Sequence, residues 1–185
     1  FLEIDKAIRL NFQKLGETHK VIANLQSSLF SSITSSSKMM RLNEICKFEN
    51  GDRGKNYPSK KLQLSKGVPF VNAGNFTLDG DISTDGMVYI SDERFELLGA
   101  GKFKIDDILF CLRGSLGKSA LNRTIEKGAI ASSLVILRAN PEIVSSDYLF
   151  AFIRSDIVKK YIAETAGGAA QPNLSAKVVS NYQIP

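Results

Sequence analysis

The chain has 185 residues, of which 43% are hydrophobic and 23% charged, with a net charge of +5 and an isoelectric point near 9.2. This composition indicates one ordinary globular domain plus an appendage, or two very small domains, and it argues against a disordered chain. The mild positive charge favours a polyanionic partner, although charge alone is equally compatible with a basic surface that has no nucleic-acid role.

Cysteine and histidine usage points away from metal chemistry. Cys46 and Cys111 have no partner at a metal-ligand spacing, and the single histidine, His19, lies in a helical pattern. We therefore expect no metal and no cofactor, and interpret the cysteines as reduced core residues of a cytoplasmic protein. No apolar run approaches the ~20 residues that a membrane-spanning helix needs, so we expect no membrane partner.

A seven-residue apolar repeat runs through residues 1 to about 36. Its fully apolar seam consists of Phe1, Ile8, Leu15, Ile22 and Leu29. In the second seam only Ile4 and Leu25 are strongly apolar, which predicts a long amphipathic helix that packs against another helix. At about 1.5 Å per residue this coiled-coil helix would span roughly 50 Å and protrude, serving spacing or assembly. The alternative is a helix that folds back as two shorter pieces at Gly16.

A run rich in serine and threonine, residues 31–37, ends the heptads, because these side chains compete for backbone hydrogen bonds and favour helix ends. We place a boundary there. The predicted units are a spacer or dimerisation helix over residues 1–38 and a folded domain over residues 39–185.

The domain begins with one short amphipathic turn or strand over residues 41–48. Short apolar segments with turn residues between them then predict strands, at residues 67–72, 86–90, 107–112 and 129–137. Helical spacing follows over residues 147–162, with Ser145 or Ser146 as its cap, and a further short helix is expected after Ser175. The expected fold is α+β: a mostly antiparallel β domain with small helices, preceded by one long protruding coiled-coil helix.

Charge is distributed unevenly along the domain. Residues 47–66 carry six basic and two acidic side chains, and residues 113–127 carry four basic and one acidic. Between residues 79 and 107 the balance reverses, with eight acidic and three basic side chains. A protein that grips a duplex from one side would show this polarity, although solvated loops could produce it by chance.

The two basic segments contain glycine-rich loops, residues 50–58 and 112–118. Glycine allows a backbone to approach phosphate closely, and Ser115 and Lys118 could position it. The loops could equally be plain hairpin turns. The spacing Gly114-Ser115-Leu116-Gly117-Lys118 is not that of a nucleotide-binding P-loop, because the first glycine is too close to the Gly-Lys pair.

Other polar side chains could contact base edges. Arg53 or Arg113 could contact guanine through two hydrogen bonds. Adenine could be contacted by an amide side chain from Asn72, Asn75, Asn122 or Gln171. For Asn72 and Asn75 a simple turn role is an equal alternative.

No catalytic constellation is apparent in the sequence. It contains no Gly-x-Ser-x-Gly, His-Glu-x-x-His or EF-hand pattern, and the lone histidine disfavours a hydrolytic triad. Adjacent carboxylates such as Asp92 and Glu93 would point to opposite faces of a strand. We therefore expect this chain not to be an enzyme by itself.

The ordered set of segments resembles a target-recognition domain, with its spacer helix, from the specificity subunit of type I restriction–modification enzymes. The segments that carry the resemblance are residues 4–8, 67–75, 80–82, 89–91, 106–109, 114–118, 132–138, 148–149, 167–175 and 184–185. They cover nearly the whole chain. No single segment is specific, but their order is.

The resemblance implies a function and partners. Specificity subunits of this family carry two recognition domains held apart by two antiparallel helices, and each domain reads half of a bipartite target. The implied partners are double-stranded DNA, the DNA adenine methyltransferase (modification) subunit and the restriction subunit. Because one helix and one domain are present here, the chain is either a half-subunit that forms a homodimer through residues 1–38 or a piece of a longer chain.

By position within the family-like segments, DNA contact is expected at Arg53, Lys55, Asn72, Asn75, Arg113, Ser115, Lys118, Gln171 and Asn173. We expect the loops near residues 53 and 115 to share one face of the molecule. Two alternatives remain: a non-DNA coiled-coil assembly scaffold that acts through residues 1–36, and an RNA-binding domain, which the lack of clustered aromatic residues disfavours.

Overall fold

The structure, a computed structural model, describes residues 37–166 and 173–185, and in the segment before them residues 17, 18, 21, 24, 25, 28–30, 32 and 33. The described residues between 17 and 33 are helical. Most of the coiled-coil helix predicted over residues 1–38 lies outside the described residues, so that helix and the boundary after residue 38 stay predictions. Phe30 is a described member of this segment, and it is 4% exposed, with its ring centroid 5.5 Å from that of Tyr148 and 5.7 Å from that of Phe152.

Three sheets organise the domain. A two-stranded sheet pairs β1 (Met40–Arg41) with β10 (Gln183–Ile184), which are the first and last strands. A four-stranded antiparallel sheet has the order β2 (Cys46–Asn50), β9 (Leu134–Ala139), β6 (Ile108–Cys111) and β7 (Ser119–Leu121). A second has the order β4 (Val88–Ile90), β3 (Val68–Val71), β8 (Gly128–Ile130) and β5 (Lys102–Phe103).

The predicted α+β class with mostly antiparallel strands is confirmed. One described pair departs from it, because β3 runs parallel to β8, with Phe70 opposite Ala129 and Val71 opposite Ile130. Residues 72–127 lie between the two strands, and parallel neighbours need such a long crossover because a hairpin cannot join them. No local sequence pattern marks this pairing.

The central strands β6 and β9 separate two hydrophobic layers. Ile108 and Phe110 pack into the cluster that contains the helices, whereas Leu109 and Cys111 pack into the cluster facing the second sheet. The alternation follows from the two-residue period of a strand. Because both faces of β6 are covered, its sequence is continuously apolar, as expected for a buried strand.

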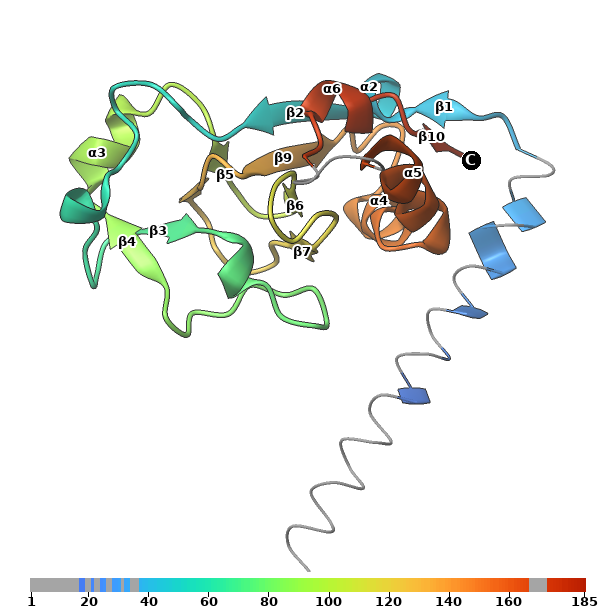
Figure 1. Cartoon of the computed structure of the whole chain (residues 1–185), viewed down its shortest axis with the longest axis horizontal. Helices are drawn as coiled ribbons and strands as arrows, with labels where there is room; N and C mark the ends of the chain where they lie inside the picture. Colours follow the sequence, from blue (N-terminus) through green and yellow to red (C-terminus); the bar gives the residue numbers. More distant parts are fainter. Residues whose placement is uncertain are drawn as a thin grey trace, which may run out of the picture.

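Five α-helices are described. They are α2 (Leu42–Ile45), α3 (Asp92–Leu97), α4 (Ser146–Ile153), α5 (Asp156–Ala166) and α6 (Ala176–Val179). Two 3-10 turns complete the set, η1 (Lys60–Leu62) and η2 (Ala73–Asn75). Figure 1 shows α3 with β3 and β4 at one end of the domain and α4 with α5 at the other.

The predicted cap at Ser145 is present, and Ser175 caps the short helix that was expected to follow it. Ser145 Oγ accepts a hydrogen bond from the Tyr148 N–H at 3.1 Å and begins α4, and Ser175 Oγ accepts from the Val178 N–H at 3.2 Å and begins α6. The helical stretch predicted over residues 147–162 is two helices rather than one. The residues predicted as one turn or strand over 41–48 are α2 followed by β2.

An ion-pair group ties the two four-stranded sheets together. Arg138 on β9 donates two hydrogen bonds of 2.7 Å to the carboxylate of Asp107, which is only 1% exposed. Glu49 at the end of β2 accepts from the N–H groups of Gly101 and Lys102 at 2.8 and 3.1 Å. Lys102 belongs to β5, so these contacts fix the segment before β5 against the end of β2.

Candidate nucleic-acid interface

A cleft of about 790 Å³ opens where the ends of β2 and β6 meet residues 99–100 and the start of α6. Three cationic side chains line it: Arg53, Arg113 and Lys177. The loops that contain Arg53 and Arg113 therefore lie on the same face of the domain, as a single DNA-contacting face requires.

Two carboxylates also line the cleft, but both are held by the backbone. Asp52 Oδ1 accepts from the Gly54 N–H at 2.6 Å, and Oδ2 accepts from the Gly99 N–H at 2.8 Å. These hydrogen bonds, that from Gly54 foremost, lower the pKa of Asp52 below its ordinary value. Glu49 is held in the same way by residues 101 and 102, so both acids serve to shape the wall of the cleft.

The wall beside Arg53 needs a glycine. A Cβ atom on Gly51 would lie 2.6 Å from the carbonyl oxygen of Ala131, so the two backbones pack closer than any side chain allows. Arg53 extends from this junction and donates from Nη2 to the Ser132 carbonyl at 3.2 Å, while remaining exposed. Here the glycine serves protein packing, not the approach of a phosphate.

The 113–118 loop is a tight turn between β6 and β7. Arg113 and Ser115 are exposed on it. Gly114 has a φ of +78°, and a Cβ there would meet nothing within 4 Å, so its backbone faces open space. Asn173 pairs with Arg113 through an isolated β-bridge, which brings the segment after residue 172 beside this turn. Arg113, Ser115 and Asn173 thus form one exposed group.

Lys118 is part of the scaffold of this region. Its ammonium donates a 2.9 Å hydrogen bond to the carbonyl of Ala73 in η2, and its side chain is half-buried. This contact joins the 113–118 loop to the turn that contains Asn72. Two segments that were predicted separately from the sequence are therefore neighbours.

The η2 turn gives its two asparagines different positions. Asn72 Oδ1 accepts from the Gly74 N–H at 2.7 Å, and the Asn72 N–H donates to Asn75 Oδ1 at 3.1 Å. Asn75 is 4% exposed, whereas Asn72 is exposed at the surface. Both make the turn contacts that were the alternative to DNA contact, and Asn72 is the one that a ligand can reach.

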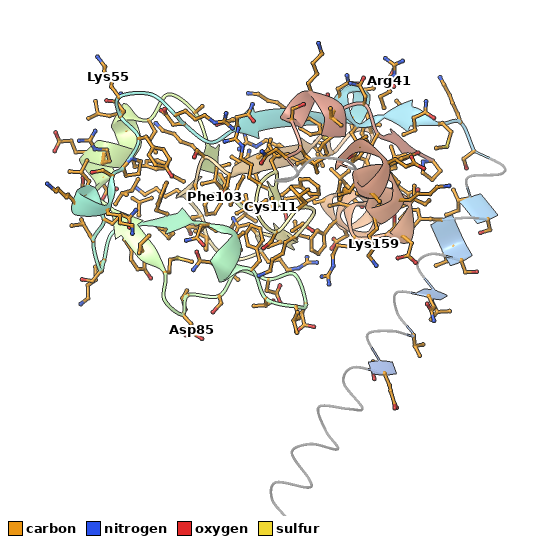
Figure 2. All side chains as sticks on the ribbon, viewed as in Figure 1. Arg41, Lys55, Asp85, Phe103, Cys111 and Lys159 are labelled. Atoms are coloured by element: carbon orange, nitrogen blue, oxygen red, sulfur yellow. The ribbon has the colours of Figure 1, made fainter. Side chains whose placement is uncertain are left out.

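The remaining predicted site residues lie apart from this group or outside the described residues. Lys55 is exposed near the end of the domain that carries α3, away from Cys111 in the central sheet (Figure 2). Gln171 falls outside the described residues. Asn122 is 1% exposed, and its amide bonds the backbone N–H and carbonyl of Ile125 at 3.0 and 2.7 Å, so it cannot contact a base.

The second basic segment keeps unpaired cations over only part of its length. Arg123 pairs with Asp147 at 2.7 Å, and this hydrogen bond raises the pKa of Arg123. Lys127 pairs with Asp92 at 2.6 Å. Two of the four cations counted between residues 113 and 127 are thus neutralised by acidic residues from elsewhere in the chain.

The first basic segment keeps its charge. Among the described residues no carboxylate forms an ion pair with its six cations, which are Lys47, Arg53, Lys55, Lys60, Lys61 and Lys66. Lys177 extends the cationic lining of the cleft and was missed in the sequence. In the sequence, the only feature that points to Lys177 is its place in the short helix predicted after Ser175.

The two cysteines are free and buried. Burial raises the pKa of the Cys46 thiol to about 12 and also raises that of Cys111, whose Sγ donates to the Arg113 carbonyl at 2.9 Å. Within residues 37–166 and 173–185 and the few described before them, no group of three His, Cys, Asp or Glu side chains could hold a metal ion. None of the described helices is long and apolar enough to cross a membrane.

Comparison with known proteins shows the family and the fold of the chain. A family model described as the type I restriction modification DNA specificity domain matches residues 34–185. The HsdS subunit from Thermoanaerobacter tengcongensis has a similar structure, with a TM-score of 0.65 and 15% identity over 97% of this chain and 42% of that one. The S subunit of a type I restriction-modification system from M. genitalium gives a TM-score of 0.59 at 15% identity, over 98% of this chain and 44% of that one.

A similar fold also occurs in the type IIG restriction endonuclease BpuSI, with a TM-score of 0.58 and 12% identity over 86% of this chain and 26% of that one. The chain spans less than half the length of each of these solved chains. The family match extends over most of the sequence and confirms the resemblance seen in the ordered segments. The chain belongs to the family of type I restriction modification DNA specificity domains.

Proposed function

We propose that the domain binds a specific sequence in double-stranded DNA and supplies target recognition to a type I restriction–modification complex without catalysing a reaction itself. The observation that carries the proposal is the cleft in which Arg53, Arg113 and Lys177 meet. Its two carboxylates are held by backbone N–H groups, which leaves the guanidinium and ammonium groups available to phosphates and base edges.

Within this interface the side chains take different roles. Arg113 is exposed beside Asn173, and a guanidinium there suits a bidentate contact to guanine in the major groove. Ser115 and the open backbone at Gly114 suit a phosphate contact. Lys177 and Arg53 contribute charge at the cleft wall. Asn72, whose turn is joined to this region through Lys118, would contact a neighbouring base or phosphate.

The partners follow from the family. The proposed complex contains the DNA adenine methyltransferase (modification) subunit and the restriction subunit, and it works in the cytoplasm. Residues 1–38 would act as the spacer helix, either pairing with a second copy in a homodimer or with a second helix of a longer chain. Phe30 supports contact between this segment and the domain, because its ring packs against those of Tyr148 and Phe152.

Selection from a random duplex pool tests the proposal. The purified chain is incubated with the pool, bound DNA is recovered and sequenced, and affinity for the winning duplex is measured at rising salt. We expect a defined motif and an affinity that falls steeply with salt. Recovery of no motif, with affinity independent of salt, would overturn the proposal.

A truncation separates this function from that of an assembly scaffold. Removing residues 1–28 deletes most of the heptad segment but keeps Phe30 in the core. DNA recognition predicts weaker binding with the same motif. A scaffold that acts through the helix predicts loss of every interaction.

A further inference from the structure

We infer that residues 59–66 form a second DNA contact, a ledge that binds backbone phosphates beside the target and carries no sequence information. This inference rests on the proposed function and assigns a role to Lys60, Lys61 and Lys66. All three are exposed, and none pairs with a carboxylate among the residues that the structure describes.

The ledge is fixed to the domain at both ends. Before it, Tyr57 packs edge-on against Phe70 with ring centroids 5.7 Å apart, and Asn56 Nδ2 donates to the Leu97 carbonyl at 2.7 Å. At its far end Leu64 and Tyr89 exchange two backbone hydrogen bonds of 2.8 and 3.0 Å. The η1 turn between these anchors holds Lys60 and Lys61. Lys60 and Lys61 therefore sit on an ordered support, which reduces the entropy that they lose when they bind a ligand, and Lys66 follows the second anchor just before β3.

A short segment of chain connects the ledge to the wall of the cleft. The chain runs from Arg53 in the cleft wall to Ser59 in only six residues, and Lys55 lies between them toward the α3 end of the domain (Figure 2). A duplex that lies across the cleft along this direction would pass from Arg113 and Asn173 to the ledge. The ledge lysines would act on those phosphates of such a duplex that come within the roughly 8 Å screening length of physiological salt.

The neighbouring acidic helix does not cancel this charge. On α3, Asp92 is paired with Lys127 at 2.6 Å, and Glu96 lies 3.7 Å from the ammonium of Lys102. Two of the three carboxylates of α3 are therefore paired with cations outside the ledge, which leaves the charge of the ledge lysines in place.

The ledge is suited to phosphate and unsuited to reading bases. Lysine presents a flexible point charge, whereas bidentate recognition of a base edge depends on the planar fork of arginine or an amide. Residues 59–66 contain no arginine and no asparagine, and Gln63 is half-buried. Contacts from this segment would strengthen binding to every sequence by the same factor.

Two matched triple variants test the inference. The ledge variant carries Lys60→Gln, Lys61→Gln and Lys66→Gln. The control carries Lys104→Gln, Lys159→Gln and Lys160→Gln, which removes the same net charge elsewhere; Figure 2 shows Lys159 at the opposite end of the domain from Lys55. For wild type and both variants, Kd is measured against salt for the selected duplex and for a scrambled duplex.

We expect the ledge variant to lower the slope of log Kd against log salt by up to about 2.7. This is about 0.9 for each phosphate that the variant no longer neutralises. The ratio of the two Kd values and the selected motif should stay as in wild type. The control should keep the wild-type slope. Trimming the duplex on the ledge side should weaken wild type but leave the ledge variant unchanged.

Equal slopes for the two triple variants would overturn the inference, and so would a changed motif in the ledge variant. Normal DNA binding with loss of the methyltransferase subunit would also overturn it, by making the ledge a protein-docking surface. If instead the proposed function is wrong, the wild-type chain itself will select no motif, which distinguishes that outcome from failure of the ledge inference.

Discussion

The ammonium of Lys118 lies 2.9 Å from the carbonyl oxygen of Ala73, and this hydrogen bond connects the loop after β6 to the turn after β3. The loop after β6 belongs to the four-stranded sheet that contains β9, and the turn after β3 belongs to the other four-stranded sheet. Two exposed groups, around Arg113 and around Asn72, are consequently held at a fixed separation. The hydrogen bond helps to hold these two loops in one arrangement.

Replacing Lys118 by methionine should lower the free energy of unfolding by about 1 to 2 kcal/mol, because the variant cannot donate a charged hydrogen bond to the half-buried carbonyl. Urea denaturation measures this. Hydrogen exchange should rise at residues 72–76 and 114–118 and not on α5. If Lys118 served only to contact phosphate, the Lys118→Met variant without DNA would have the same free energy of unfolding as wild type.

Arg113 and Lys177 line the same cleft, but replacing each by alanine should change DNA binding in a different way. Arg113→Ala should reduce discrimination at one base pair by about 1 to 3 kcal/mol, because alanine cannot make the two hydrogen bonds to the base. Lys177→Ala should weaken binding to all duplexes alike and flatten the salt dependence by about 1. A panel of single-base-pair substitutions in the selected duplex separates the two. The assignment fails if Arg113→Ala shows no position-dependent effect.

The pair formed by Arg138 and Asp107 supports the junction between the sheets. Arg138→Met should destabilise the domain by about 3 kcal/mol, because it leaves the Asp107 carboxylate buried without its partner. The double variant with Asp107→Leu removes both charges and should recover much of the stability. Thermal unfolding of the three proteins provides the test, and an unchanged melting temperature for Arg138→Met is the contrary outcome.

Asp52 gives the domain a defined acid dependence. Its pKa is lowered from an ordinary value of 3.8, mainly by the Gly54 hydrogen bond, so its ionised form stabilises the fold. This contribution is fully present above the unfolded pKa and is lost as pH falls through the lower folded pKa. Asp52→Asn should therefore be less stable than wild type at neutral pH, and the difference should narrow below pH 3.8. Melting temperatures across the acid range check the sign, and a difference that widens in acid contradicts it.

The sequence predicted much of the fold because its strongest patterns are local. The apolar runs at residues 107–112 and 129–137 contain β6 and most of β8 and β9. As expected, Ser145 caps α4 and a short helix follows Ser175. The parallel pairing of β3 with β8 was missed, because it joins segments far apart in the chain. The break between α4 and α5 was also missed, since apolar spacing continues across residues 154 and 155.

The candidate site was predictable only in part. Glycine and arginine in the 112–118 loop identified an exposed turn, and the structure places Arg113 and Asn173 side by side. Counting charge along the sequence failed at Arg123 and Lys127, because their acidic partners come from distant segments. Asn122 looks like any surface asparagine in sequence, and only tertiary structure shows its amide occupied by Ile125.

The central claim is that this cationic cleft distinguishes one duplex sequence from another. The ratio of Kd values for a scrambled and a selected duplex, measured at one physiological salt concentration, tests it most directly. We predict a ratio of about 10 or more, since each mismatched base pair in a specific site costs about 1 to 3 kcal/mol, and a smaller ratio when Arg113 is replaced by alanine. Equal Kd values for the two duplexes with the wild-type chain would contradict the account.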